Sequence, residues 1–299
     1  MVLPESARLH RMIHYTGWPL AFLFVWDVIV TLAYVYVPHP GFELPALPMT
    51  LLGSALALFL GFRNNHAYAR WWEARTLWGA MVNVSRSFGR AAFHLIDDRA
   101  ESRELRQALI LRQIAYVHAL RCHLRRQPSF DEIRDFLTAD EVERLKNVAN
   151  VPNAILNETA AMISAAAAGG MLDSIRRVQI ETLLVEMSTA QGGMERIKNT
   201  PLPREYAYFP TLFVQVFCVL LPIGLVDSLT IYTPLASTIV GFMLLAMDRV
   251  GSDLQDPFEN RAHDVPLTAL CRTIQIDLEQ LRGERAAPQP LRPVSNVLW

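Results

Sequence analysis

The chain has 299 residues, of which 52% are hydrophobic, and its 28 basic and 29 acidic residues leave a formal net charge of −1. Such a chain is too apolar for an ordinary soluble protein and too polar for one that lies wholly inside a bilayer, so we expect a membrane protein with a large aqueous part. The balanced charge, without a basic stripe, gives no electrostatic footprint for a nucleic-acid partner. The few, widely separated cysteines predict no disulfide framework.

Four apolar stretches are long enough to cross a lipid bilayer, which takes about 20 residues. They are residues 18–37, 44–62, 207–226 and 230–247. No cleavable leader pattern precedes the first stretch, so we expect it to remain as a transmembrane helix. It contains Asp27, and a charge inside a span is costly and commonly functional. Asp27 therefore has either a pore or gating role or a basic partner near the inner surface.

The distribution of basic residues along the chain predicts which segments lie on the cytoplasmic side of the membrane. The connections at residues 38–44 and around Asp227 and Ser228 contain no Lys or Arg. Because positively charged segments stay in the cytoplasm, both termini and the central block are predicted to be cytosolic. The predicted parts are an N-terminal arm with two spans (1–62), a cytosolic helical region (63–206), two further spans (207–248) and a cytosolic C-terminal region with a proline-rich tail (249–299).

The central block is predicted to be helical throughout, which makes the fold class all-α. Two pairs of residues have the capping-box form, in which a hydroxyl and a glutamate three residues later satisfy each other's backbone amides. They are Ser129 with Glu132, and Thr138 with Glu141. Two long runs, residues 153–168 and 173–199, contain few strand formers and end at glycine or proline. The tail after Arg282 is rich in proline and is expected to be extended.

A helix from about residue 51 to beyond Trp78 is expected to leave the bilayer near Phe62 and continue into the cytosol without a break. Ser54, Leu58 and Phe62 follow one another at i, i+4 and i+8 and therefore share one face of this helix. Small residues at the same spacing on an adjacent face would let neighbouring helices approach closely. The row of Ser54, Leu58 and Phe62 faces a lumen, lipid or the core; spacing alone leaves these open.

The sequence offers little chemistry for catalysis. It contains no Ser/His/Asp constellation, glycine-rich phosphate loop or paired-carboxylate site, so we expect neither an enzyme nor a cofactor. His118, Cys122 and His123 could share part of a helix face, but no further ligands cluster with them and a zinc site is not expected.

Several motifs in order along the chain resemble a bacterial member of the bestrophin family. They are GFRNNHAYARWWEAR (61–75), KNTPLP (198–203), PIGLVD (222–227) and DPFENRAHDVPLTALCRTI (256–274). The resemblance implies a homopentamer of helical subunits around one central pore, with four membrane helices and a large cytosolic region in each subunit. It also implies a multi-pass protein of the bacterial inner membrane that passes monovalent ions.

Carried over by position, the family's hydrophobic neck falls on Ser54, Leu58 and Phe62. Animal members have bulky apolar residues at all three places, so Ser54 implies a wider or wetter outer end. The family's second, cytosolic constriction is placed first at Leu172, with Ile175 and Val178 as alternatives.

Animal members also carry an acidic run that clasps calcium, and such sites need about six to eight oxygen ligands. Here Asp256-Pro257-Phe258 is followed by only two separated acids, Glu259 and Asp264, with an arginine between them. We therefore predict no calcium gating and no metal site.

The neck residues also bear on the choice of ion. Aromatic ring edges favour anions. Phe62 is the one aromatic residue at the three neck positions, so the neck has few such edges. We therefore expect a preference for monovalent cations such as sodium. Chloride remains the alternative within the same family. A membrane-anchored helical scaffold that conducts nothing is the alternative of a different class.

Overall fold

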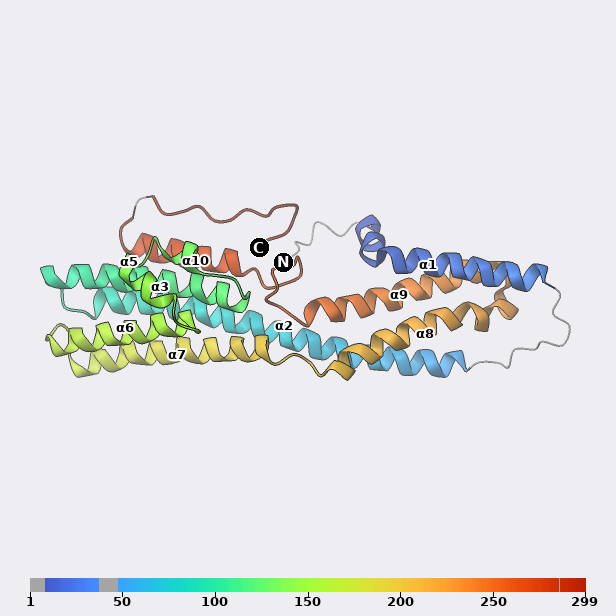
Figure 1. The fold of residues 1–299 in the computed structure, drawn as a ribbon, viewed down its shortest axis with the longest axis horizontal. Coiled ribbons are helices and arrows are strands. Elements are labelled where there is room, and N and C mark those ends of the chain that lie inside the picture. The colour runs from blue at the N-terminus through green and yellow to red at the C-terminus, as the bar shows by residue number, and fades with distance from the viewer. Residues whose placement is uncertain (1–8, 38–47, 285) are drawn as a thin grey trace. The chain divides into compact units, whose positions relative to one another are not determined.

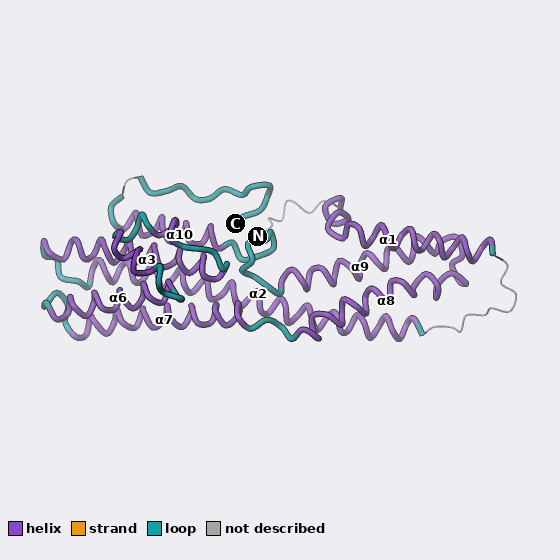
Figure 2. Tube along the Cα trace, viewed as in Figure 1, coloured by secondary structure: helices purple, strands orange, loops and turns teal. Residues whose placement is uncertain are grey.

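The computed structural model describes residues 9–37, 48–284 and 286–299. These residues form helices joined by loops (Figure 2), and the β-structure among them is one isolated bridge between Val294 and Val297. The chain divides into two compact units. The apolar unit comprises described residues 9–37, 48–71 and 201–256, and the polar unit comprises 72–200, 257–284 and 286–299. The predicted connection at 38–44 and residues 44–47 of the second predicted span lie outside the described residues.

The apolar unit is a bundle of long helices. It contains α1 (Leu9–Tyr36), the first part of α2 (Met49–His94), α8 (Arg204–Leu229) and α9 (Thr233–Leu254), and the 3-10 turn Thr230–Tyr232 joins α8 to α9. α1, α8 and α9 pack against one another in pairs (Figure 1). Their core contains Leu23 of α1, Leu244 of α9 and Phe217 of α8, together with Leu56 and Leu60 of α2.

Two segments of the described chain are long and apolar enough to cross a membrane, Thr16–Tyr36 and Arg204–Leu254. The second segment contains α8, the turn and α9, so it holds two consecutive helices rather than one. The fourth predicted span began at Thr230, whereas α9 begins at Thr233. Pro234 in the first turn suits a helix start there, since its missing amide hydrogen would be unpaired in any case.

α1 bends at Gly17, which has a positive φ of 45°. Only glycine adopts this region readily, and Pro19 follows two residues later. The straight part of α1 that matches the first predicted span therefore begins after this bend.

The polar unit contains the rest of α2 and six further helices. These are α3 (Ala100–Leu124), α4 (Phe130–Ile133), α5 (Ala139–Leu145), α6 (Val151–Ala168), α7 (Ser174–Asn199) and α10 (Leu267–Leu281). α3 packs against α6, α7 and α10, and α6 packs against α7 (Figure 1). Residues 286–299 follow without a helix, and the amide of Ala269 donates to the carbonyl of Trp299 at 2.7 Å.

The predicted unbroken helix through Arg63 and Trp78 is confirmed by α2. The capping box of Thr138 and Glu141 is also confirmed. The capping box at Ser129 is wrong, because the Ser129 backbone is helical rather than extended and its side chain caps nothing. The Glu132 carboxylate instead forms an ion pair with the Arg121 guanidinium at 2.8 Å.

Candidate functional site

The row of Ser54, Leu58 and Phe62 lies on an exposed face of α2 in the single chain. Leu58 is 61% exposed and Phe62 is 54% exposed, and Ser54 is exposed as well. The Ser54 hydroxyl donates to the Thr50 carbonyl of its own helix at 2.7 Å, so it offers little to a neighbour. Leu56 and Leu60 on the same turns are buried in the core of the apolar unit. α2 therefore turns its large apolar side chains in two directions, one into the core and one outward.

A buried arginine follows the row immediately. Arg63 is 1% exposed, and its guanidinium forms an ion pair with the Asp248 carboxylate of α9. The same guanidinium donates to the Ser252 hydroxyl at 2.5 Å and to the Asp248 carbonyl at 3.3 Å. Thr211 of α8 donates its hydroxyl to the Asp248 carboxylate at 2.9 Å. We call Arg63, Asp248, Ser252 and Thr211 the arginine clamp, and it joins α2 to α8 and α9 one residue after Phe62.

α9 approaches α2 closely beside the clamp. The Asn64 side-chain amide donates to the Met247 carbonyl at 3.0 Å, and Arg70 Nε donates to the Gln255 carbonyl at 2.8 Å. A Cβ placed on Gly251 would lie 2.1 Å from Asn64 Oδ1, which is inside any van der Waals contact. The absence of a side chain at Gly251 is therefore what lets the two helices come this close.

The arginine clamp was not predicted from the sequence, although the sequence contains a signal for it. Arg63 follows the second predicted span directly, and Asp248 follows the fourth. In the predicted topology both spans end on the cytosolic side, so an arginine and an aspartate stand at the same membrane level. Opposite charges at matching ends of two spans would have indicated a pair.

Asp27 lies inside the apolar unit and not on the exposed row. It is fully buried, and its carboxylate accepts hydrogen bonds from the hydroxyls of Ser237 at 3.1 Å and Thr238 at 3.0 Å on α9. Within the described part of the chain no basic side chain pairs with it. The geometry gives Asp27 a role in joining α1 to α9.

The three candidates for the cytosolic constriction differ in exposure. Leu172, in the turn between α6 and α7, is 5% exposed, whereas Ile175 and Val178 on the first turns of α7 are 72% and 64% exposed. A residue that lines an open passage must be accessible in the single chain. In the single chain Leu172 is therefore inaccessible, whereas Ile175 and Val178 are accessible.

The two acids of the expected calcium region have other partners. The Lys198 ammonium pairs with the Glu259 carboxylate at 2.5 Å. Asp264 is buried and accepts a hydrogen bond from the Arg261 backbone amide at 3.0 Å, and burial raises the pKa of its carboxyl group. Among the residues that the structure describes, no three His, Cys, Asp or Glu side chains cluster as metal ligands would, His118 and Cys122 included.

Comparison with known proteins gives the family. A model described as Bacterial/Fungal Bestrophin protein matches residues 10–280. The chain belongs to this bestrophin family. The resemblance seen in the motifs is thus confirmed, and the all-helical fold agrees with it.

Relatives and a solved structure extend over nearly the whole chain. The voltage-dependent anion channel-forming protein YneE of Escherichia coli (strain K12) is 32% identical over 300 residues, which is 98% of this chain and 97% of that protein. The voltage-dependent anion channel-forming protein mll4386 of Mesorhizobium japonicum is 35% identical over 252 residues, covering 84% and 79%. The crystal structure of a bacterial bestrophin homolog from Klebsiella pneumoniae matches with a TM-score of 0.85 and 29% identity, covering 90% of this chain and 98% of that one.

Proposed function

We propose that five copies of this chain surround one passage in the bacterial inner membrane and conduct small ions through it. Each copy would cross the membrane four times, with both termini in the cytoplasm. The observation that carries this proposal is the outward row of Leu58 and Phe62 on α2, opposite Leu56 and Leu60 in the core. One subunit cannot enclose a passage with a single helix face, so symmetry-related copies would bring five such rows together.

The row would act as the neck of this passage. A narrow ring of apolar side chains obstructs ions by excluding water as well as by its width. Leu58→Ala and Phe62→Ala should therefore raise unitary conductance or open probability in planar bilayers, and Ser54→Ala should change them less. Leu32→Ala is a matched control, because Leu32 is also about half exposed but lies on α1. Unchanged currents in both neck variants would mean that the row faces lipid or another subunit.

A second ring is proposed at Ile175 instead of Leu172. Ile175 is the more exposed of the two and stands in the first turn of α7. Helix N-termini carry partial positive charge. The adjacent Arg176 pairs with Asp97 and Asp173 at 2.9 and 3.2 Å, and Arg177 stands 4.0 Å from Glu181. Both arginines are therefore paired with carboxylates, so Ile175 supplies an apolar ring and the charges beside it do not select the ion.

For the ion we propose chloride and similar small anions. The names of the relatives, which describe anion channel-forming proteins, support this choice. The preference for monovalent cations, which depended on a single ring at Phe62, has no such support. Reversal potentials across bilayers with asymmetric NaCl and then KCl test it: a shift toward the chloride equilibrium potential is expected, and a shift toward the cation potential would reverse the assignment.

We further propose that calcium does not gate the passage. Glu259 is neutralised by Lys198, and Asp264 is buried, so neither carboxylate is free to bind a hard cation. Micromolar free calcium on the cytosolic side should leave open probability unchanged. A several-fold activation that Glu259→Ala abolishes would contradict this.

Native mass spectrometry in detergent tests the assembly, and a pentamer is the expected dominant species. Reconstituted vesicles separate the channel from a membrane-anchored scaffold, because a scaffold would give no ion flux. A dominant monomer without flux would overturn the proposal.

A further inference from the structure

The C-terminal end of α3 carries an arginine where glycine is the usual residue. The Gln127 amide donates to the Cys122 carbonyl at 2.9 Å and the Arg126 amide donates to the His123 carbonyl at 3.0 Å, which is the Schellman pattern of a helix end. Arg126 is the first residue beyond the cap and has a positive φ of 55°. This left-handed conformation is unfavourable for residues with a Cβ, so glycine or asparagine is preferred there. Arg126 is exposed, so its guanidinium is accessible from solvent.

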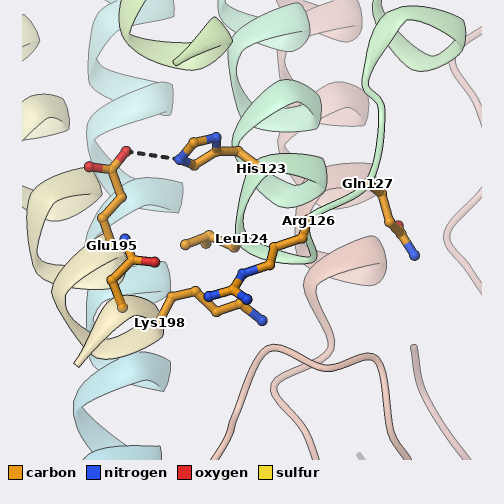
Figure 3. A pocket seen from close by; sticks show the side chains of 7 residues that line it. His123, Leu124, Arg126, Gln127, Glu195 and Lys198 are labelled. Carbon is orange, nitrogen blue, oxygen red and sulfur yellow. Dashed lines mark ion pairs between the residues drawn. The ribbon is translucent and has the colours of Figure 1, made fainter. Parts of the chain in front are cut away.

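That side chain lines a cavity of about 250 Å³ at the ends of α3 and α7 (Figure 3). Lys198 lines the same cavity, and its side chain is only 9% exposed. Its ammonium already has Glu259 as a partner at 2.5 Å. For the Arg126 guanidinium, by contrast, the described part of the chain provides no carboxylate.

Among the described residues that line the cavity Glu195 is the one acid, and one of its two carboxylate oxygens is engaged. Glu195 Oε1 stands 3.5 Å from His123 Nε2, as the dashed line in Figure 3 shows. The same oxygen accepts hydrogen bonds from the side-chain amides of Gln191 at 2.7 Å and Asn150 at 3.0 Å. The cavity therefore presents the exposed guanidinium of Arg126, which has no carboxylate partner among the described residues, beside the largely buried Lys198 ammonium and its partner Glu259. The Oε1 atom of Glu195 is taken up by its hydrogen bonds with Gln191 and Asn150.

We propose that this cavity binds a small oxyanion, a phosphate or a short carboxylate. A guanidinium recognises the paired oxygens of either group with two parallel hydrogen bonds. The size of the cavity sets the upper limit, because pockets for drug-sized ligands measure about 300–1,000 Å³. A volume of about 250 Å³ accommodates inorganic phosphate or succinate. The site lies wholly in the polar unit and does not depend on ion conduction.

The same side chains have a competing structural explanation. Helix C-termini are electronegative, and basic side chains near them add stability. On that explanation Arg126 and Lys198 serve only the ends of α3 and α7. Replacement of Arg126 by glycine separates the two roles, because glycine relieves the left-handed backbone while it removes the guanidinium.

Isothermal titration calorimetry on the purified full-length protein in detergent tests the proposal, with sodium phosphate and sodium succinate as probes and sodium chloride at equal ionic strength as the reference. Wild type should bind phosphate, succinate or both, and Arg126→Gly should weaken binding by about ten-fold or more while its unfolding temperature stays the same or rises. Lys198→Gln should weaken binding as well. Arg134→Ala, which removes an exposed arginine of the same unit, should change nothing.

Three results would each overturn the proposal. They are no binding of either probe to wild type, heats that chloride reproduces, and an Arg126→Gly variant with unchanged affinity.

Discussion

Removal of the Asp248 carboxylate should destabilise the protein far more than removal of an exposed carboxylate that pairs with arginine at a similar distance. In Asp248→Ala the Arg63 guanidinium keeps its place between α2 and α9 but loses its ion-pair partner. The guanidinium is only 1% exposed, so water cannot take over the lost interaction. A matched control exists in the polar unit, where Arg196 and Glu73 pair at 2.5 Å with 67% and 45% of their side chains exposed.

The expected magnitudes follow from this difference in burial. Removal of one partner of a buried pair costs about 3–5 kcal/mol, since it leaves an uncompensated charge. An exposed pair is worth about 0–1 kcal/mol. At roughly 2–4 °C per kcal/mol for a chain of comparable size, Asp248→Ala should lower the unfolding temperature by about 6–20 °C and Glu73→Ala by less than about 4 °C.

Thermal unfolding of the detergent-solubilised variants, at one scan rate, measures both shifts. The double variant Arg63→Met with Asp248→Leu should recover most of the loss, because buried apolar residues replace a buried pair at little cost. Equal shifts for Asp248→Ala and Glu73→Ala would refute the argument from burial. So would a double variant as unstable as Asp248→Ala.

Three further predictions concern other parts of the chain. Gly251→Ala places a Cβ 2.1 Å from Asn64 Oδ1 and should cost about 1–3 kcal/mol in thermal unfolding, and Asn64→Ala in the same chain should restore most of it. Burial lowers the pKa of His118 from 6.5 to about 4, so between these values the unfolded chain binds a proton that the folded chain does not. The contribution of His118 to stability should therefore be level above pH 6.5 and fall by up to about 3 kcal/mol as the pH drops to 4. Unfolding measured against pH should show this fall as the difference between wild type and His118→Gln. Ile175→Ala should raise single-channel current with little loss of stability, whereas Leu172→Ala should cost about 2–5 kcal/mol and leave the current unchanged; the reverse pattern would return the constriction to Leu172.

Helix positions were predictable from sequence because their signals are local. Thr138 and Glu141 satisfy each other within one turn, and the confirmed box there needs no distant partner. The box at Ser129 failed for a tertiary reason, since Glu132 is drawn to Arg121 on α3 instead of its own helix start. A capping pattern specifies a helix start only where no stronger distant partner competes for its glutamate.

The facing of side chains was less predictable than the helices that carry them. Leu172 and Ile175 are three residues apart and both apolar, yet one is buried in the turn before α7 and the other is exposed on its first turn. Hydropathy cannot separate them, because the difference depends on packing around that turn. Arg126 shows the same limit, since its left-handed backbone is set by the hydrogen bonds that end α3.

Phe62 and Arg63 connect the clamp to the proposed neck. Successive residues point about 100° apart around a helix, so one faces outward while the other is buried. A rotation of α2 by one residue would move Phe62 toward the core and pull Arg63 away from Asp248, at a cost of about 3–5 kcal/mol for the broken pair. The clamp thus fixes the rotation of α2 at the turn where the neck ends. If the row lines the passage, Asp248→Ala should change open probability as well as stability, although Asp248 contributes no side chain to the row.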